Sequence, residues 1–149
     1  MSTDGTVEQI AITAEPHALP APVPSVRAEA GRGLEGEYHW SADPEPGQSI
    51  TLIAAEALEG LREDTGIDLS HAASRRNLLT RGIDLDALVG RRFRVGDVDC
   101  EGVELCEPCN TLAKLTERGV LRGLVHRGGL RADILAGGEI AVGDPVRAA

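Results

Sequence analysis

The chain of 149 residues carries 24 acidic and 15 basic side chains, a formal net charge of −9 at pH 7, and has three aromatic residues. This charge excludes a general binder of nucleic acid, and the shortage of rings leaves no stacking platform for single-stranded bases. The length and the aliphatic composition predict one folded domain, residues 1–149, with an aliphatic core.

The first half of the chain is predicted to contain short strands and one helix. Apolar and β-branched residues indicate strands at Val7–Ile12, near Val26 and at Ile50–Ile53. The proline-rich residues 19–24 are an extended connector, and glycines 31, 33 and 36 mark a loop. Ala54–Thr65 has one apolar helical face and stops at Gly66, in the position of a C-terminal cap.

The second half is predicted to contain a strand, a short turn, two hairpins and a second helix. A strand is expected at Asn77–Thr80, and Asp84 can cap a short turn through Leu88. The hairpins pair Arg91–Val95 with Val98–Leu105, and Leu130–Leu135 with Glu139–Val142. The second helix is expected to begin at residues 108–111 and to extend to Val125. Six or more short strands around two helices predict a mainly β fold, a compact barrel with a few peripheral α-helices.

Charge is distributed unevenly along the chain. Residues 1–70 hold three arginines against thirteen acids, a net charge of −10, whereas residues 71–149 have a net charge of +1. An anionic ligand is therefore expected to bind the second half. No apolar run reaches the about 18 residues of a membrane span, and the acidic N-terminus lacks an export signal, so we expect a cytoplasmic protein without a membrane span.

The segment Cys106-Glu107-Pro108-Cys109 is the most chemically suggestive part of the sequence. Cys109 is expected in the first turn of a helix, where unpaired N–H groups and the helix dipole favour a thiolate. It is therefore a candidate metal ligand or nucleophile. Four interpretations remain open: two small core cysteines, a redox pair, a zinc site completed by Cys100 or His126, and a single thiolate that binds the soft metal of a cofactor.

Two other segments carry candidate ligand-binding residues. Arg75 and Asn77, followed by Thr80, could contact a phosphate and the edge of a heterocycle, and the alternative is a charged turn that enters a strand. His39 lies between two aromatic residues and could line a pocket entrance, while Arg127 precedes a Gly-Gly turn that lets the backbone approach a ligand. An ordinary surface side chain is the alternative for both.

Taken in chain order, these segments resemble the MOSC family, the domain type found at the C-terminus of molybdenum-cofactor sulfurases and as small stand-alone bacterial proteins. The resemblance covers nearly the whole chain. The matching segments are Gly31-Arg-Gly-Leu-Glu-Gly36, Gln48-Ser-Ile-Thr-Leu-Ile53, Arg75-Arg-Asn-Leu-Leu-Thr-Arg-Gly82, Leu88-Val-Gly90, Phe93-Arg-Val-Gly96, Cys106-Glu-Pro-Cys109 and Arg127-Gly-Gly-Leu130. One segment departs from the family: Tyr38 stands after the glycine loop where an arginine is often found, and a phenol does not position a phosphate as an arginine does.

The resemblance implies a MOSC-type β-barrel that binds a pterin-based molybdenum cofactor, with Cys109 as the thiolate ligand of molybdenum. Reduction of N-hydroxylated compounds is the activity that it implies, with electrons from a separate electron-donor protein. Arg75 and Asn77 correspond to an Arg-x-Asn element beside the pterin. The complete set of candidate cofactor-binding residues is Arg75, Asn77, Thr80, His39 and Arg127.

Two alternative functions follow from the same segments. In the first, Cys109 carries a persulfide received from a separate cysteine desulfurase, and Cys106 releases it by disulfide exchange. Pyridoxal phosphate would belong to that partner, because Lys114 is the only lysine and lacks a phosphate-binding context. In the second, a degenerate MOSC domain acts as a binding module, which the departure at Tyr38 favours.

Overall fold

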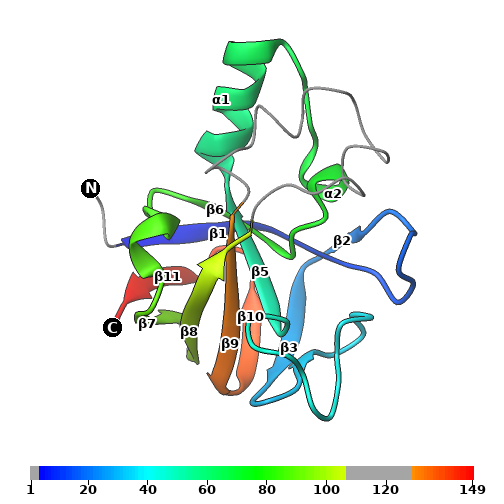
Figure 1. The fold of residues 1–149 in the computed structure, drawn as a ribbon, viewed down its shortest axis with the longest axis vertical. Coiled ribbons are helices and arrows are strands. Elements are labelled where there is room, and N and C mark those ends of the chain that lie inside the picture. Colours follow the sequence, from blue (N-terminus) through cyan, green and yellow to red (C-terminus); the bar gives the residue numbers. More distant parts are fainter. Residues whose placement is uncertain (1–3, 107–128) are drawn as a thin grey trace.

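The computed structural model describes residues 4–106 and 129–149, and all the elements named below belong to these residues (Figure 1). The strands are β1 (Asp4–Ile12), β2 (Ala21–Val23), β3 (Ser25–Glu29), β4 (Gly33–Leu34), β5 (Ile50–Ala54), β6 (Leu78–Arg81), β7 (Arg92–Val95), β8 (Val98–Leu105), β9 (Leu130–Ala136), β10 (Gly138–Ala141) and β11 (Pro145–Ala148). The helices are α1 (Ala55–Thr65), α2 (His71–Ser74) and the 3₁₀-helix η1 (Leu85–Leu88).

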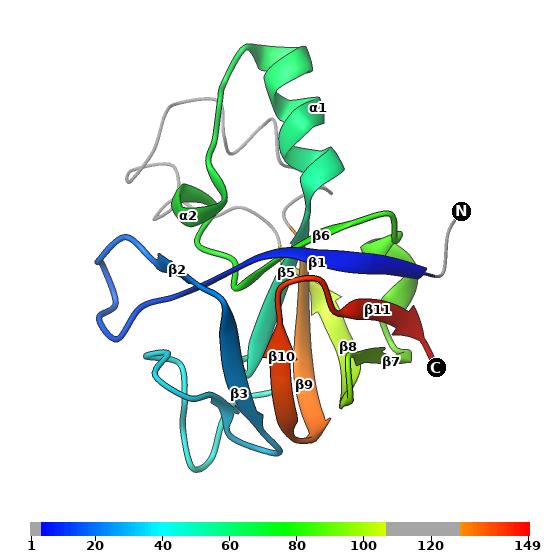
Figure 2. The same cartoon turned by 180° about the vertical axis from the view of Figure 1, so that it is seen from behind.

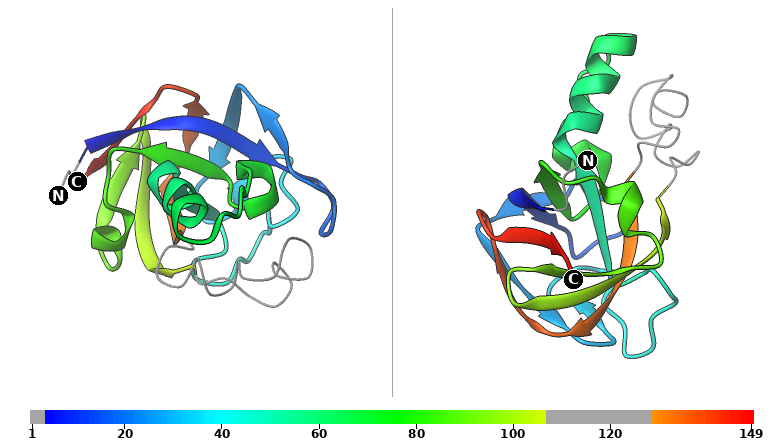
Figure 3. Two further views of the ribbon diagram at one scale, coloured as in Figure 1. Left: turned by 90° about the horizontal axis from the view of Figure 1, so that it is seen from above. Right: turned by 90° about the vertical axis from the view of Figure 1, so that its left-hand side faces the viewer.

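Seven of the described strands close into a barrel (Figure 3). The hydrogen-bonded order around it is β1, β11, β7, β8, β9, β5, β6 and β1 again, and among these neighbours β5 and β6 form the parallel pair. Closure satisfies the backbone groups that an open sheet would expose at its edges. The prediction of a mainly β barrel with a few peripheral helices is confirmed.

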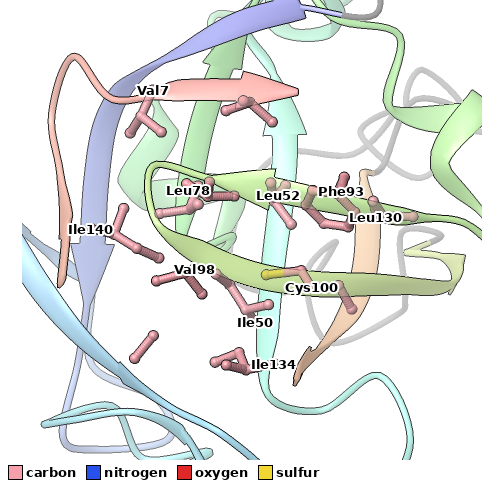
Figure 4. Close-up of a cluster of buried hydrophobic side chains, with 14 of the residues drawn as sticks. Val7, Ile50, Leu52, Leu78, Phe93, Val98, Cys100, Leu130, Ile134 and Ile140 are labelled. Carbon is pink, nitrogen blue, oxygen red and sulfur yellow. The ribbon is translucent and has the colours of Figure 1, made fainter. Parts of the chain in front are cut away.

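Aliphatic side chains fill the barrel, as the composition predicted (Figure 4). Alternate residues point inward, so that Phe93 and Val95 of β7 face Leu130 and Ile134 of β9 within one cluster. Phe93 is fully buried, and β8 adds the thiol of Cys100 to the same cluster. Removal of this apolar surface from water is the main favourable contribution to folding.

Most predicted elements within the described residues are confirmed. The helix predicted at Ala54–Thr65 is α1, and it ends at Gly66, whose φ of 78° is the left-handed conformation of a C-terminal cap. The Asp84 side chain accepts a hydrogen bond from the backbone N–H of Asp86, which caps η1. The first hairpin is formed by β7 and β8. The helix predicted from residue 108 to Val125 lies outside the described residues.

The prediction of a final hairpin between Leu130–Leu135 and Glu139–Val142 is wrong. Strand β9 pairs with β8 on one edge, and on its other edge it pairs with β5 at residues 130–132 and accepts a hydrogen bond from the Gly31 N–H at Ile134. Strand β10 instead pairs with β3, which with β4 forms a separate three-stranded sheet. Gly137 lets the chain leave β9 and pass close to the backbone of β3, because a Cβ atom at this position would lie 2.5 Å from the carbonyl oxygen of Ala28.

The helices α1 and α2 lie at one end of the barrel (Figures 1 and 2). Leu61 of α1 forms a second apolar cluster with Leu69, against which Leu58 and Ala73 pack. The helices connect β5 to β6 and therefore deliver residues 74–77 to this end of the barrel. In the described part of the chain, no helix has both the length and the apolar character needed to span a bilayer.

We expect the substitution Gly102→Ala in β8 to lower the free energy of unfolding by about 2 kcal/mol, because the barrel wall leaves no room for a side chain there. A Cβ atom would overlap the carbonyl oxygen of Leu88 in η1. Denaturant unfolding measures the change. Gly143→Ala is the control: it has a φ of 95° but open space around the position, and should cost about 1 kcal/mol. Equal stabilities for the two variants would contradict the packing of η1 on β8.

Candidate functional site

Arg75, the first residue of the predicted Arg-x-Asn element, ends helix α2 in the left-handed conformation, with a φ of 62°. Its Nη1 donates to the carbonyl oxygen of Ala18 at 2.9 Å, and its Nη2 donates to that of Pro16 at 2.5 Å. The guanidinium therefore holds the turn of residues 13–20 against the end of the barrel. The left-handed backbone is what directs the side chain to this turn, and it costs about 1–2 kcal/mol for a residue other than glycine.

Asn77 is buried, and its amide joins three strands of the barrel. Its Oδ1 accepts from the backbone N–H and from the Oγ1 of Thr51, at 3.0 and 3.1 Å. Its Nδ2 donates to the carbonyl oxygen of Ala11 at 3.4 Å. The amide therefore links β1 and β5 next to the start of β6, and its hydrogen-bonding groups are engaged within the fold.

Thr80 is also turned into the barrel. It is fully buried in β6, and its hydroxyl donates to the carbonyl oxygen of Ile53 in β5 at 3.4 Å. The sequence motif correctly predicted a strand after the arginines, and the inward alternation of that strand places Thr80 in the core.

Arg76 belongs to the segment predicted from the sequence but was not among its predicted site residues, and it has the most unusual position of the three consecutive polar residues. It is 9% exposed, and its Nη2 donates to the carbonyl oxygen of Cys106 at 3.4 Å. The backbone N–H of Cys106 in turn donates to the carbonyl oxygen of Gly129 at 2.7 Å. A positive charge is thus buried where β8 ends, and a guanidinium buried there requires polar partners.

Two of the three cysteines are described, and both are buried free thiols. Burial in the core raises the pKa of the Cys100 thiol to about 12, with a smaller contribution from the nearby carboxylates of Asp99 and Asp133. A thiol of this kind is a core residue and a poor metal ligand. Within residues 4–106 and 129–149, no three His, Cys, Asp or Glu side chains come together as a metal site.

His71, which the sequence did not mark as functional, is buried at the start of α2. Its Nδ1 lies 2.8 Å from the Oε1 of Gln9 on β1. Its Nε2 is buried without a hydrogen-bond partner in the described part of the chain. Burial lowers the pKa of His71, although the nearby backbone of Arg76 and Asn77 opposes part of this effect. The ring therefore favours its neutral form.

His39 belongs to a different part of the surface. Its Nδ1 lies 2.6 Å from the Oε2 of Glu37, a buried carboxylate that also accepts from the backbone N–H of Thr13. The His39 ring lies against that of Tyr38, with 3.9 Å between the centroids. An open cavity of about 460 Å³ adjoins this loop, and its lining residues are Ala14, Glu29, Glu35, Gly36, Glu37, Tyr38 and Trp40.

The structure therefore brings the sequence-predicted residues together only in part. Arg75, Asn77 and Thr80 lie at one end of the barrel, and His39 lies beside the acidic cavity. The turn of residues 13–20 connects the two regions, because it contacts Arg75 at Pro16 and Ala18 and contacts Glu37 at Thr13. Cys109 and Arg127, like His126, lie outside the described residues.

The sequence of residues 37–147 matches the family model of the MOSC domain. Because this match spans most of the chain, the chain belongs to the MOSC domain family. No curated protein matches the chain significantly in sequence.

Solved structures show the same fold. The YuaD protein from Bacillus subtilis is similar with a TM-score of 0.81 and 14% identity, over 97% of this chain and 95% of that one. YiiM from Geobacillus stearothermophilus has a TM-score of 0.75 and 15% identity, over 97% of this chain and 75% of its own. YiiM from Escherichia coli has a TM-score of 0.70 and 16% identity, over 97% and 69%.

We expect Asn77→Ala to lower the free energy of unfolding by about 1–3 kcal/mol, because it leaves the backbone N–H of Thr51 and the carbonyl oxygen of Ala11 without their partner. Thr80→Val, which removes a hydroxyl with one long hydrogen bond, should cost about 1 kcal/mol or less. Denaturant unfolding of both variants measures the difference. Wild-type stability of Asn77→Ala would show that its amide does not join the strands.

We expect the stability of the protein to fall as the pH drops below about 6.5, the ordinary pKa of histidine, because protonation of His71 is easier in the unfolded chain. The stability that depends on neutral His71 is fully present above about pH 6.5. It is lost as the pH falls toward the lowered pKa of His71 in the folded state. Unfolding free energies between pH 7.5 and pH 5 should decline less steeply for His71→Gln. A decline as steep in His71→Gln as in the wild type would contradict this role of His71.

Proposed function

We propose that this MOSC domain binds the molybdenum cofactor, with Cys109 as the thiolate ligand of molybdenum. The observation that supports it most is the fixed end of β8, where Cys106 is held by Gly129 and by the buried guanidinium of Arg76. Cys109 follows Cys106 by three residues. A positive charge near the start of this segment favours the anionic form of a thiol.

The described residues fit an anionic cofactor through their charge. Both guanidinium groups, of Arg75 and Arg76, donate to backbone carbonyl oxygens and keep their positive charge, so they favour a pterin phosphate at this end of the barrel electrostatically. Asn77 and Thr80 are engaged within the barrel, so in this proposal they position the arginines and do not contact the cofactor. Arg127 is proposed as a further cofactor-binding residue. His39 is the weakest member of the set, because the three carboxylates beside it oppose a phosphate.

When bound, the molybdenum centre supplies the two-electron chemistry that removes oxygen from N-hydroxylated compounds. The electrons come from a separate electron-donor protein in this proposal. The role of the chain itself is to hold the metal through Cys109 and to neutralise the phosphate with arginines.

Sulfur transfer is less well supported. Cys106 is 2% exposed, and its backbone is hydrogen-bonded on both sides. A thiol buried in this way cannot attack a persulfide on Cys109 unless the end of β8 first opens.

We further propose that residues 1–149 form one MOSC domain. Strand β1 precedes the range that matches the family model, yet it pairs with β6 and β11 to close the barrel. Truncation at residue 37 would therefore remove a strand of the barrel itself.

We expect the protein produced in a host that makes the cofactor to carry molybdenum, and Cys109→Ser to lose most of it. Cys100→Ala is the matched control, because it removes a thiol from the core and should retain the metal. Elemental analysis and extraction of the pterin measure the content, and circular dichroism confirms folding.

Wild-type protein that folds normally without molybdenum would refute the proposal. Mass spectrometry after incubation with a cysteine desulfurase then tests the alternative. A gain of one sulfur atom on Cys109 in metal-free protein would assign the chain to sulfur transfer.

A further inference from the structure

The cavity beside the loop of residues 35–40 has a chemical character opposite to that of the arginine-bearing end of the barrel. Its lining includes three carboxylates, Glu29, Glu35 and Glu37, and two aromatic rings, Tyr38 and Trp40. Among the residues that the structure describes, no lysine or arginine lines it. Its volume of about 460 Å³ lies within the roughly 300–1,000 Å³ typical of small-molecule sites.

The three carboxylates differ in how many further hydrogen bonds they can accept from a ligand. Glu37 is buried and accepts hydrogen bonds from Thr13 and His39. From the described residues Glu29 accepts one hydrogen bond, that of the Trp40 indole at 3.2 Å, and a carboxylate has capacity for more. The carboxylate of Glu35 is exposed and forms no hydrogen bond or ion pair with the described residues. Glu29 and Glu35 can therefore accept hydrogen bonds from a ligand.

The aromatic wall independently favours a cation. Trp40 is fixed by its bond to Glu29, and the guanidinium carbon of Arg32 lies 5.6 Å from the centroid of its ring. A guanidinium is thus already placed against this ring by the fold itself. Planar cations gain both from the faces of such rings and from bidentate hydrogen bonds to carboxylates.

We propose that this cavity binds a planar organic cation, an amidinium or guanidinium group, between the aromatic rings and the carboxylates of Glu29 and Glu35. Anions are disfavoured there, because three carboxylates line the cavity and no basic side chain is among its described lining residues. This inference does not depend on the cofactor, since the lining of the cavity includes neither Arg75 nor Arg76, the described arginines proposed to face the cofactor phosphate.

Trp40 provides a direct readout, because it is the only tryptophan in the chain. The probe is benzamidine, a planar cation at neutral pH, and its neutral isostere benzamide is the matched control. Titration with benzamidine should change the Trp40 emission in a saturable way, whereas benzamide should bind about tenfold more weakly or not at all. Acetyl-arginine amide, titrated in parallel, tests whether the cation can be an arginine side chain of a polypeptide.

Three variants and one control test the assignment of residues. Glu35→Gln and Glu29→Gln should each weaken benzamidine binding by about 3- to 10-fold. Glu63→Gln makes the same charge change on an exposed position of α1, outside the cavity lining, and should leave the affinity unchanged. Trp40→Leu, followed by calorimetry, should weaken binding by a similar factor without altering the fold.

Binding of benzamidine alone would assign the site to a small molecule, and binding of both cations would extend it to arginine side chains. Equal affinities for benzamidine and benzamide would overturn the proposal. It would equally fail if Glu29→Gln and Glu35→Gln, folded as judged by circular dichroism, bound benzamidine as the wild type does.

Discussion

The pairing of β1 with both β6 and β11 is the constraint on which the rest of the structure depends. Thr6 alone is paired with Arg81 on one side and with Pro145 on the other, so β1 joins the two ends of an otherwise open sheet. The register shift between Val7 and Gln9 marks an irregularity of the kind that lets a strand bend around a barrel. The same strand then supports the candidate site, because Gln9 holds His71 and the carbonyl oxygen of Ala11 accepts from Asn77.

Local features of the fold could be predicted from the sequence, and long-range pairing could not. Alternation along Arg92–Val95 and Val98–Leu105, with Gly96 between them, specifies a hairpin because the two strands are adjacent in the chain. The same alternation on both sides of Gly137 predicted a hairpin of β9 with β10, whereas β10 pairs with β3. Whether two neighbouring strands pair depends on whether other strands already occupy their edges, and β5 and β8 flank β9 on both sides. That information is distributed over about 85 residues of the chain, from β5 to β9.

In the candidate site, too, the sequence predicted the segment but not the directions of its side chains. Arg75-Arg76-Asn77 was recognisable as a segment that matters, but the sequence could not tell which of the three side chains faces the interior. That choice follows from the left-handed backbone at Arg75, which turns its guanidinium toward residues 16–18 and leaves Arg76 buried beside Cys106. Polar residues at the end of a barrel have two tasks, to satisfy the backbone groups there and to bind ligands. Asn77 and Thr80 perform the first.

The uneven charge of the sequence corresponds to two separate regions of the structure. Much of the acid excess of residues 1–70 is on the surface, and three of its carboxylates meet at one cavity. Two arginines of the second half, Arg75 and Arg76, lie in the other region, at the end of the barrel. A turn of eight residues, 13–20, contacts both, through Thr13 at Glu37 and through Pro16 at Arg75. The turn therefore lies between a region that favours anions and a cavity that favours cations. In this arrangement Tyr38 supplies an aromatic wall for a cation, which gives the departure from the family sequence a physical reason.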